Sequence, residues 1–484
     1  MDGLYKKAGS TFFLKVFGLG IAFIFQIILG RLLEPASYGE YTMYLTYSSI
    51  FTIITVFGMD QNLIKEIAKN NNDKKRSNSL LQLSMIISIM LCFLVSVTVF
   101  FFKDKLDFGA DGVYLFIAMS IIRTIVMIFD GFLQGNGLVV RVTVLNDVIN
   151  NLLKVIFFIA IANSGTSSLK AALWSFIFSE FIMAILRFLD INKILGNKYK
   201  LTIGLDKKVK KEFIKYSSTI LFVSGIGILL QNVDRIMISS YLDLANVGIY
   251  KVSQNYVSLI GVFISPFIAF WPVISKLYHE NKLFEIQEEM KRIVKIVTYL
   301  VIPMFFIFLF QSSSLLSIFG EYYATKAGAQ VLIILAFSFL IDAISGPIGS
   351  ILTMTKYAKF ILYNSIVALI VNIILNLILI DKFGIVGVAI ATGISIILNN
   401  MLSILEVKIL LGIFSYDSKN LVQIILLSAF NFILGELLSK IINMNSYFIQ
   451  VIFYGVSIYI INMIVVVYIY RKDISIFLKE RGKK

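Results

Sequence analysis

The chain has 484 residues, of which 58% are hydrophobic and 15% charged, and its formal net charge is +15 at pH 7. With a mean hydropathy of +0.86, this composition excludes a soluble protein and predicts a polytopic membrane protein. The basic residues fall between apolar runs, as the positive-inside rule describes, so nucleic-acid binding is a poor explanation of the charge.

Fourteen apolar runs of about 20 residues predict fourteen membrane-spanning helices. Their approximate limits are 11–30, 41–58, 80–102, 113–134, 142–163, 169–188, 217–240, 248–275, 293–318, 327–352, 358–380, 384–411, 419–439 and 447–470. Most lysines and arginines lie on one side if the N-terminus is cytoplasmic, and an even number of spans then places both termini there.

The basic residues are densest between the sixth and seventh runs, from Arg187 to Lys215. This segment contains DKKVKKEFIKY, which predicts a basic amphipathic helix on the inner membrane surface. We expect it to separate two lobes. The predicted divisions are a first lobe at 1–190, a basic linker at 191–216, a second lobe at 217–411, two extra spans at 419–470 and a basic tail at 471–484.

A short sequence recurs at an offset of 209 residues. GRLLEPASYGEY at 30–41 and SSYLDLANVGIY at 239–250 each lie between two apolar runs. The aligned pairs are Leu33 with Leu242, Glu34 with Asp243, Ala36 with Ala245, Gly39 with Gly248 and Tyr41 with Tyr250. A repeat at this distance predicts two homologous lobes, an architecture found in transporters. We expect a structural role for the motif, with Gly39 permitting a close approach or an unusual backbone conformation.

Ionisable residues inside the predicted spans are candidates for function because burying charge in a bilayer is costly. Helical spacing puts Arg123 and Asp130 on one face, and Asp147, Asn150 and Lys154 on another. Candidate substrate-binding residues are Lys15, Gln26, Arg123, Lys154, Arg235 and Lys251. Candidates for ion coupling or charge pairing are Asp130, Glu180, Asp234 and Asp342. The cations predict a cavity that suits a diphosphate.

Structural roles compete with these assignments. Asp130 can neutralise Arg123, and Glu180 can neutralise Arg187, without any contact to a substrate. We expect Arg187, at the end of a span, to extend to the inner surface. Pro266, Pro272, Pro303 and Pro347 predict kinks in spans eight to ten.

Several classes of chemistry are not expected. The single cysteine, Cys92, lies in an apolar run, and the single histidine, His279, lies in a polar loop. We therefore expect no intrachain disulfide, zinc site or histidine-based active site. The GxxxxGK[ST] motif is missing from the sequence, so direct ATP use is not expected either. These patterns predict a transporter without a cofactor or a metal, rather than an enzyme.

Three segments resemble the Wzx-type polysaccharide flippases of the multidrug/oligosaccharidyl-lipid/polysaccharide exporter superfamily. They are the 30–41 turn with its echo VGIYK from Val247, the run NIILNLILIDKFGIVGVAIAT at 372–392, and a weaker copy of that run, NDVINNLLKVIFF, from Asn146. The resemblance implies two six-helix lobes in a V shape that open alternately to either side. It also implies a polyprenyl-pyrophosphate-linked sugar unit as the substrate.

We therefore expect a flippase that moves lipid-linked oligosaccharide repeat units across the bacterial cytoplasmic (inner) membrane for surface polysaccharide synthesis. Membrane lipids are expected partners, and a coupling cation and polysaccharide polymerase or synthase proteins are further candidates. Three alternatives stay open: a flippase of lipid-linked peptidoglycan precursors, a multidrug/cation antiporter of the same superfamily, and a non-transporting scaffold of a polysaccharide synthase.

Overall fold

Regular structure in the described part of the chain is entirely helical. The structure, a computed structural model, describes residues 2–69, 73–103, 108, 112–196, 206–264, 271–414, 416 and 418–481. Within these ranges, 12 helices are long and apolar enough to cross a membrane, or 13 if one bent pair counts as a single span. Helices are the expected solution because they satisfy their own backbone hydrogen bonds inside a bilayer. The predicted all-helical, multi-span fold is confirmed.

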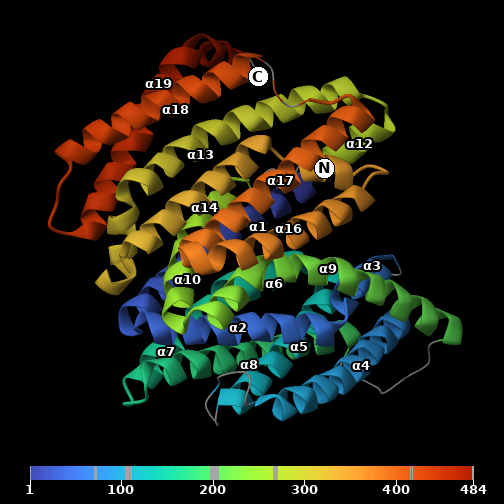
Figure 1. Cartoon of the computed structure of the whole chain (residues 1–484). Coiled ribbons are helices and arrows are strands. Elements are labelled where there is room, and N and C mark those ends of the chain that lie inside the picture. Colours follow the sequence, from blue (N-terminus) through green and yellow to red (C-terminus); the bar gives the residue numbers. More distant parts are fainter. Residues whose placement is uncertain are drawn as a thin grey trace. The chain divides into compact units, whose positions relative to one another are not determined.

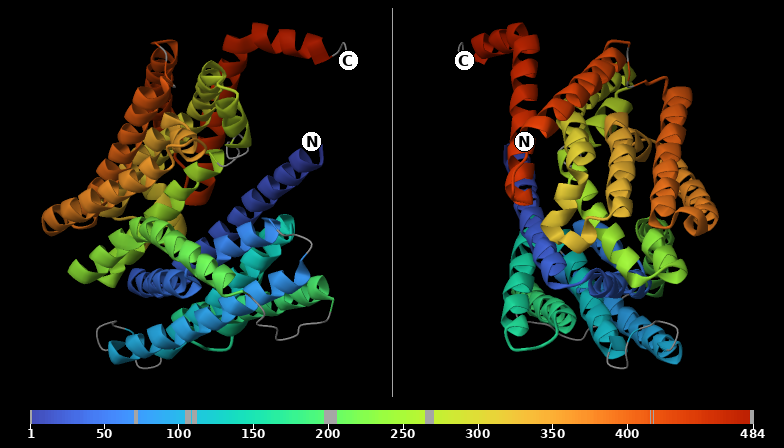
Figure 2. Two further views of the ribbon diagram at one scale, coloured as in Figure 1. Left: turned by 90° about the vertical axis from the view of Figure 1, so that its right-hand side faces the viewer. Right: turned by 60° about the vertical axis from the view of Figure 1, so that its left-hand side comes forward.

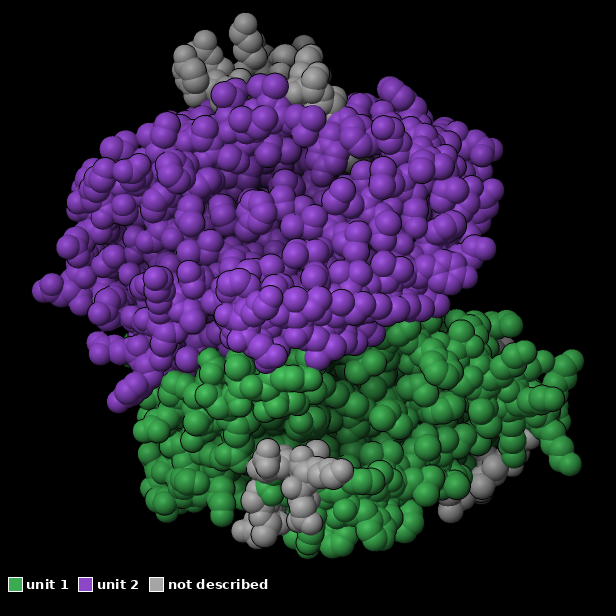
Figure 3. Space-filling view, viewed as in Figure 1, with its two compact units in different colours: residues 1–248 green, residues 249–484 purple. Residues whose placement is uncertain are grey.

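The chain forms two compact units, residues Met1–Gly248 and Ile249–Lys484 (Figure 3). The lobes predicted from the repeat divide instead at residues 191–216, of which 197–205 lie outside the described residues. The two divisions differ because α9 (Lys207–Tyr241) packs against α2 (Pro35–Val56) and α3 (Met59–Lys69) of the first unit. The repeat-based division stays a prediction.

The first unit contains the helices up to the beginning of α10 (Figure 1). Besides α2, α3 and α9, they are α1 (Asp2–Leu32), α4 (Lys74–Phe101), α5 (Gly112–Gly135), α6 (Val139–Thr143), the π-helix η2 (Val144–Ile149), α7 (Asn150–Ala162), α8 (Ser168–Leu195) and the start of α10 (Leu244–Ser258). Val126, Leu145 and Met183 form an apolar core where α5, η2 and α8 meet. This junction positions the polar residues described below.

The second unit contains the remaining helices (Figures 1 and 2). They are the rest of α10, α11 (Ile260–Ile264), α12 (Trp271–His279), α13 (Leu283–Phe319), the 3-10 turn η4 (Glu321–Tyr323), α14 (Lys326–Ser345), α15 (Ile348–Thr353), α16 (Lys359–Phe383), α17 (Ile385–Leu411), α18 (Ser418–Ile441) and α19 (Tyr447–Arg481). Here α17 packs against α14 and α16, and both α18 and α19 pack against α13.

The sequence repeat coincides with helix boundaries. Helices α1 and α9 end at Leu32 and Tyr241, and α2 and α10 begin at Pro35 and Leu244, so each pair of boundaries differs by the same 209 residues. The motif's glycine also does what the sequence predicts. A Cβ atom added to Gly39 would overlap the carbonyl oxygen of Leu244. The two copies of the motif therefore cross at backbone contact, which a larger residue prevents.

Two predicted spans are interrupted. The region 248–275 is not one continuous helix, because α10 and α11 are separated by a turn at Leu259. The region 327–352 divides into α14 and α15, because Gly346 adopts positive φ and Pro347 precedes the first residue of α15. Pro272 is the second residue of α12, and Pro266 lies outside the described residues.

Helix α13 and helix α9 differ from expectation in other ways. Pro303 lies inside α13, yet the backbone departs from helical dihedrals at Gln311, with φ −117° and ψ 17°.

The basic segment 206–216 is not a separate surface helix. It continues directly into the seventh span as the 35-residue helix α9, because the residues that follow, starting at Ser217, contain neither proline nor glycine until Gly225.

Candidate functional site

Several polar residues of the first unit surround a cavity of about 460 Å³. Four elements line it: α3, α5, the segment formed by η2 and α7, and α8. The lining residues are Asp60, Gln61, Ile64, Arg123, Val126, Met127, Asp130, Gly131, Gln134, Asn146, Asp147, Asn150, Lys154, Phe176 and Glu180. Such a volume falls in the range of small-molecule sites.

A break between α2 and α3 brings two of these residues to the cavity. Phe57 and Gly58 take positive φ values of 55° and 70°, and the two helices meet at a bend of 45°. Asn62 fixes the new direction of α3, since its Nδ2 donates to the carbonyl oxygen of Phe213 at 2.9 Å. The turn after the break therefore carries Asp60 and the next residue, Gln61, into the lining.

The π-helix η2 interrupts the fifth predicted span beside the cavity. After the start of this turn, Asn146, Asn150 and Lys154 follow one another at intervals of four residues and all line the cavity. Helix α1 lies directly against the turn, because a Cβ atom at Gly18 would overlap the backbone of Asp147. Single π-turns inside α-helices occur often at functional sites.

Arg187 and Asp130 form a buried ion pair beside the cavity. The Arg187 Nε lies 2.6 Å from the Asp130 Oδ1, and the Arg187 side chain is 0% exposed. Asn146 joins them: its Nδ2 donates to the Asp130 Oδ2 at 2.9 Å, and its Oδ1 accepts from the Arg187 Nη2 at 2.5 Å. The Met183 carbonyl oxygen accepts from Nη1 at 3.0 Å. The prediction that Arg187 extends to the inner surface is wrong, because a carboxylate and two oxygens compensate it inside the unit.

Lys154 and Glu180 form a second pair within the lining. The Lys154 Nζ lies 3.8 Å from the Glu180 Oε1, and the Asn150 Nδ2 donates to that oxygen at 2.9 Å. The Lys154 Nζ lies 4.7 Å from the ring centre of Phe176, and the Arg123 guanidinium carbon lies 5.9 Å from the same ring centre. One aromatic ring therefore attracts two cations by cation–π interaction.

The pairing differs from the pairs that the sequence suggests. Asp130 pairs with Arg187 and not with Arg123, and Glu180 pairs with Lys154 and not with Arg187. Among the described residues, Arg123 forms no ion pair. The cavity is also not cationic in formal charge, because its lining contains four carboxylates and two cationic side chains. The sequence predicts a cationic surface, but carboxylates and cations lie together in the lining, and two of the carboxylates form ion pairs.

Four other candidates of the first unit are not in the lining. Lys15 is exposed on α1, where it acts electrostatically on Asp147. Gln26 accepts a hydrogen bond from the hydroxyl of Tyr38, so it joins α1 to α2. Asp234 is buried on α9. Arg235, on the same helix, donates to the Asn232 Oδ1 at 2.8 Å and to the Gln231 carbonyl oxygen, also at 2.8 Å.

The second unit holds the last two candidates. The Asp342 Oδ1 accepts from the Asn400 Nδ2 at 2.8 Å, and within the described residues no lysine or arginine forms an ion pair with Asp342. Lys251 is half-buried on α10. The asparagines of the 372–392 motif bind neutral groups: Asn376 donates to the Asn372 side chain at 2.9 Å, and Asn372 donates to the hydroxyl of Thr392 at 3.1 Å.

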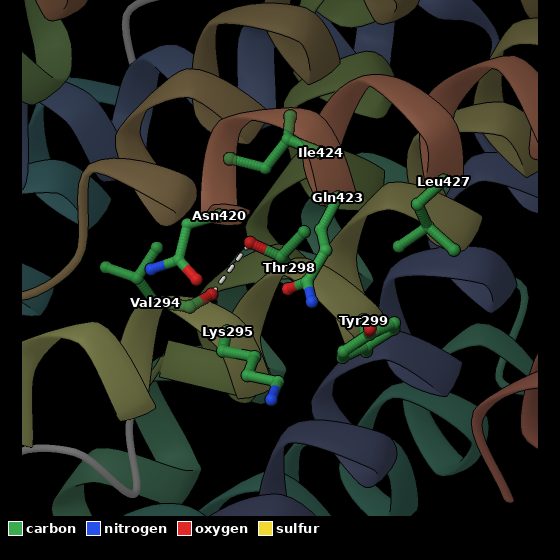
Figure 4. A pocket seen from close by; sticks show the side chains of 8 residues that line it. All are labelled: Val294, Lys295, Thr298, Tyr299, Asn420, Gln423, Ile424 and Leu427. Atoms are coloured by element: carbon green, nitrogen blue, oxygen red, sulfur yellow. Dashed lines mark hydrogen bonds between the residues drawn. The ribbon is translucent and has the colours of Figure 1, made fainter. Parts of the chain in front are cut away.

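Two other hollows in the second unit are less suited to a polar solute. Figure 4 shows the crevice where Lys295 of α13 and Gln423 of α18 line the space between their helices. Its volume of about 10 Å³ holds about one water molecule. A groove of about 440 Å³ lies along α12 and α13, but its glutamates pair locally, as Glu289 does with Arg292 at 2.9 Å.

Sequence reasoning missed Asp60, Gln61 and Asn146. The first two follow the second predicted span, and only the Phe57–Gly58 break brings them to the cavity. Asn146 opens a motif in the sequence, but nothing local marks it as a partner of Asp130. Its spacing of four residues from Asn150 and eight from Lys154 was the available signal, because such residues share a helical face.

Two family models match the chain. The model described as "Polysaccharide biosynthesis protein" matches residues 4–278, which is more than half of the chain. The MatE model matches residues 220–378. The first match contains the whole cavity, and both matches overlap the second copy of the repeated motif.

Three known proteins illustrate the likeness. The chain is 25% identical to the probable low-salt glycan biosynthesis flippase Agl15 of Haloferax volcanii, covering 81% of each chain. It is 24% identical to the capsular polysaccharide biosynthesis protein CapF of Staphylococcus aureus, covering 81% of this chain and 96% of that protein. The structure of the lipid II flippase MurJ in an inward closed conformation matches with a TM-score of 0.73 at 17% identity, covering 97% of this chain and 100% of that one. This last likeness concerns the fold.

Proposed function

The chain belongs to the polysaccharide biosynthesis protein family, and from this membership we propose that it is a flippase for polyprenyl-pyrophosphate-linked oligosaccharides. It moves the saccharide through the cytoplasmic membrane of a bacterium by alternating access, with both termini on the cytoplasmic side. The proposal is supported by the two relatives whose names include glycan or capsular polysaccharide biosynthesis. No covalent chemistry is involved.

The observation that carries the proposal is the polar cavity of the first unit. A helical membrane protein leaves ionisable side chains at span depth only where they serve a pathway or compensate one another. Here Arg123 and Lys154 line a space of about 460 Å³ together with amides and carboxylates. A saccharide needs this mixture of donors and acceptors to exchange its hydration for protein hydrogen bonds.

We assign distinct roles to the remaining candidates. Lys15, Arg235 and Lys251 remain proposed substrate-binding residues outside the cavity lining. Asp342 is the proposed coupling carboxylate, because its described partner is the neutral Asn400. An acid with a neutral partner in a bilayer gains more from binding a proton or a cation than an acid already paired with arginine.

An export assay tests the proposal. A strain that lacks its own flippase for a surface polysaccharide is complemented with the wild type or with Arg123→Ala or Lys154→Ala, at matched membrane levels. We expect surface polysaccharide from the wild type and a loss of at least about tenfold in each variant, which corresponds to roughly 1.4 kcal/mol. Lys193→Ala, an exposed position on α8, is the matched control and exports normally.

The assay separates the proposal from a scaffold role. Lipid-linked oligosaccharide should accumulate on the cytoplasmic side in the inactive variants. Normal export by both cavity variants, in a strain whose export requires the chain, would refute the transport role of the cavity and favour a scaffold.

A multidrug/cation antiporter is the second candidate, favoured by the carboxylates of the cavity and by the MatE match. Such a protein protects cells from lipophilic cations and does not restore polysaccharide. Growth in the presence of ethidium, measured in the same strains, distinguishes the two functions.

A further inference from the structure

The lining of the first-unit cavity contains more carboxylates, which accept hydrogen bonds, than cationic side chains, which donate them. Carboxylates accept hydrogen bonds and cannot donate them when ionised. Two of the four lining carboxylates, on Asp130 and Glu180, are already paired with Arg187 and Lys154. Asp60 and Asp147 are left, with Arg123 as the one other charged residue of the lining.

Among the described residues, neither of these two carboxylates forms an ion pair. The Asp60 Oδ2 accepts from the Gln61 Nε2 at 3.2 Å, which is a neutral donor. Lys15 acts on Asp147 electrostatically from an exposed position outside the lining. Both carboxylates therefore keep capacity to accept hydrogen bonds from a solute.

A buried amide oxygen adds a third acceptor. Asn150 lines the cavity and is only 5% exposed, and its Nδ2 is bound to Glu180. Its Oδ1 is buried and has no donor among the described residues. A buried acceptor without a donor is costly unless a ligand or a water supplies one. The cavity therefore contains at least one acceptor, the Asn150 Oδ1, that a ligand's donor could satisfy.

The aromatic ring in the lining, Phe176, already lies close to two cations. Phe176 has the Lys154 Nζ at 4.7 Å and the Arg123 guanidinium carbon at 5.9 Å from its ring centre. A sugar ring that stacked on Phe176 would have to compete with these cations. Hydrogen bonds to the acceptors of this cavity are therefore open to a solute without such competition.

We propose that the cavity binds the saccharide part of the substrate through its hydroxyl and amino donors and excludes the diphosphate. This inference rests on the proposed flippase function and names what that site recognises. A diphosphate brings only acceptors and negative charge, and besides Arg123 it would meet Asp60, Asp147 and the Asn150 Oδ1. A donor-rich sugar satisfies the same three groups. Sugars with a free amino group, which is cationic at neutral pH, fit best.

The sign of the cavity is measurable by cysteine labelling. Cys92 is the chain's only cysteine, so Cys92→Ala gives a cysteine-free background. Gln134→Cys then places one thiol in the lining, and Ser164→Cys, on the exposed turn after α7, serves as the reference. Purified full-length protein is labelled with a cationic and an anionic methanethiosulfonate reagent. We expect the cationic reagent to be favoured at Gln134→Cys by about fivefold relative to the reference.

Two further arms complete the experiment. Adding Asp147→Asn to Gln134→Cys should remove most of that preference, whereas Glu34→Gln, an exposed carboxylate without a capping bond, leaves it unchanged. Glucosamine should slow labelling at Gln134→Cys at lower concentrations than inorganic pyrophosphate does. Faster labelling by the anionic reagent, or stronger protection by pyrophosphate, would overturn the inference.

The labelling experiment and the export assay test the two proposals separately. If the labelling preferences are as expected but the wild type does not restore polysaccharide export, the proposed function is refuted and the donor-selective cavity is supported. If export is restored but the anionic reagent is favoured, the proposed function is supported and the proposal that the cavity selects donors is refuted.

Discussion

Removing the guanidinium of Arg187 should destabilise the first unit far more than removing an exposed cation does. The Arg187 side chain is 0% exposed and its Nε lies 2.6 Å from the Asp130 carboxylate. In Arg187→Met the methionine fills similar volume, but Asp130 and the Asn146 Oδ1 lose their cation. Breaking a buried pair from one side costs about 3–5 kcal/mol, because the remaining charge is left uncompensated.

The assay is thermal unfolding of the purified protein in detergent, followed by near-ultraviolet circular dichroism. For a unit of this size, the expected loss lowers Tm by roughly 6–20 °C. Arg141→Met is the matched control, since the pair of Arg141 with Asp190 spans 3.0 Å but leaves the arginine side chain 45% exposed. Exposed pairs contribute at most about 1 kcal/mol.

A double replacement decides whether the pair itself is responsible. Arg187→Met combined with Asp130→Leu removes both charges, and we expect it to recover most of the lost stability, since apolar replacement of both partners is often neutral. The cycle then gives a coupling free energy of about 1–3 kcal/mol. If Arg187→Met is as stable as the wild type, or if the two replacements add without coupling, the assigned pair is not formed.

Two further predictions concern the repeated motif and a loop. Gly39→Ala should lower the free energy of unfolding by about 1–3 kcal/mol, because its Cβ overlaps the Leu244 carbonyl oxygen, whereas Gly20→Ala meets no atom within 4 Å and is neutral or stabilising in the same melting assay. Burial raises the pKa of Tyr416, whose hydroxyl donates to the Ile344 carbonyl oxygen at 2.8 Å. The stability it contributes is therefore present below its ordinary value of 10.0 and lost as pH rises above it, and Tyr416→Phe should flatten that alkaline loss in a pH series of melting curves.

The sequence predicts the features that depend on local pattern. Apolar runs long enough to span a bilayer predict the helices, because the backbone has no other solution there. The 209-residue repeat predicts a junction between two spans at each copy of the motif, and α1 and α9 end there, at Leu32 and Tyr241. Periodicity also groups Asn150 with Lys154, and both line the cavity.

The remaining features depend on tertiary partners that no local pattern encodes. The position of Arg187 at the end of a span predicts the membrane surface, but its partner Asp130 lies on a different helix, 57 residues away in sequence. Asp60 reaches the cavity through a helix break at Phe57. The predicted cationic surface fails for the same reason, because the sign of a cavity depends on which charges face one another.

The two units provide an internal comparison that bears on the role of these charges. Asn146 and Asn150 in the first unit bind the carboxylates of Asp130 and Glu180. Asparagines at the same spacing in the second unit, at positions 372 and 376, bind a hydroxyl and each other. The asparagines at positions 372 and 376 therefore find hydrogen-bond partners that are not charged. Because each buried charge costs several kcal/mol before it is compensated, packing alone does not account for two ion pairs in the first unit. The proposed saccharide, bound at Asp60, Asp147 and the Asn150 Oδ1 beside these pairs, would supply a reason to retain them.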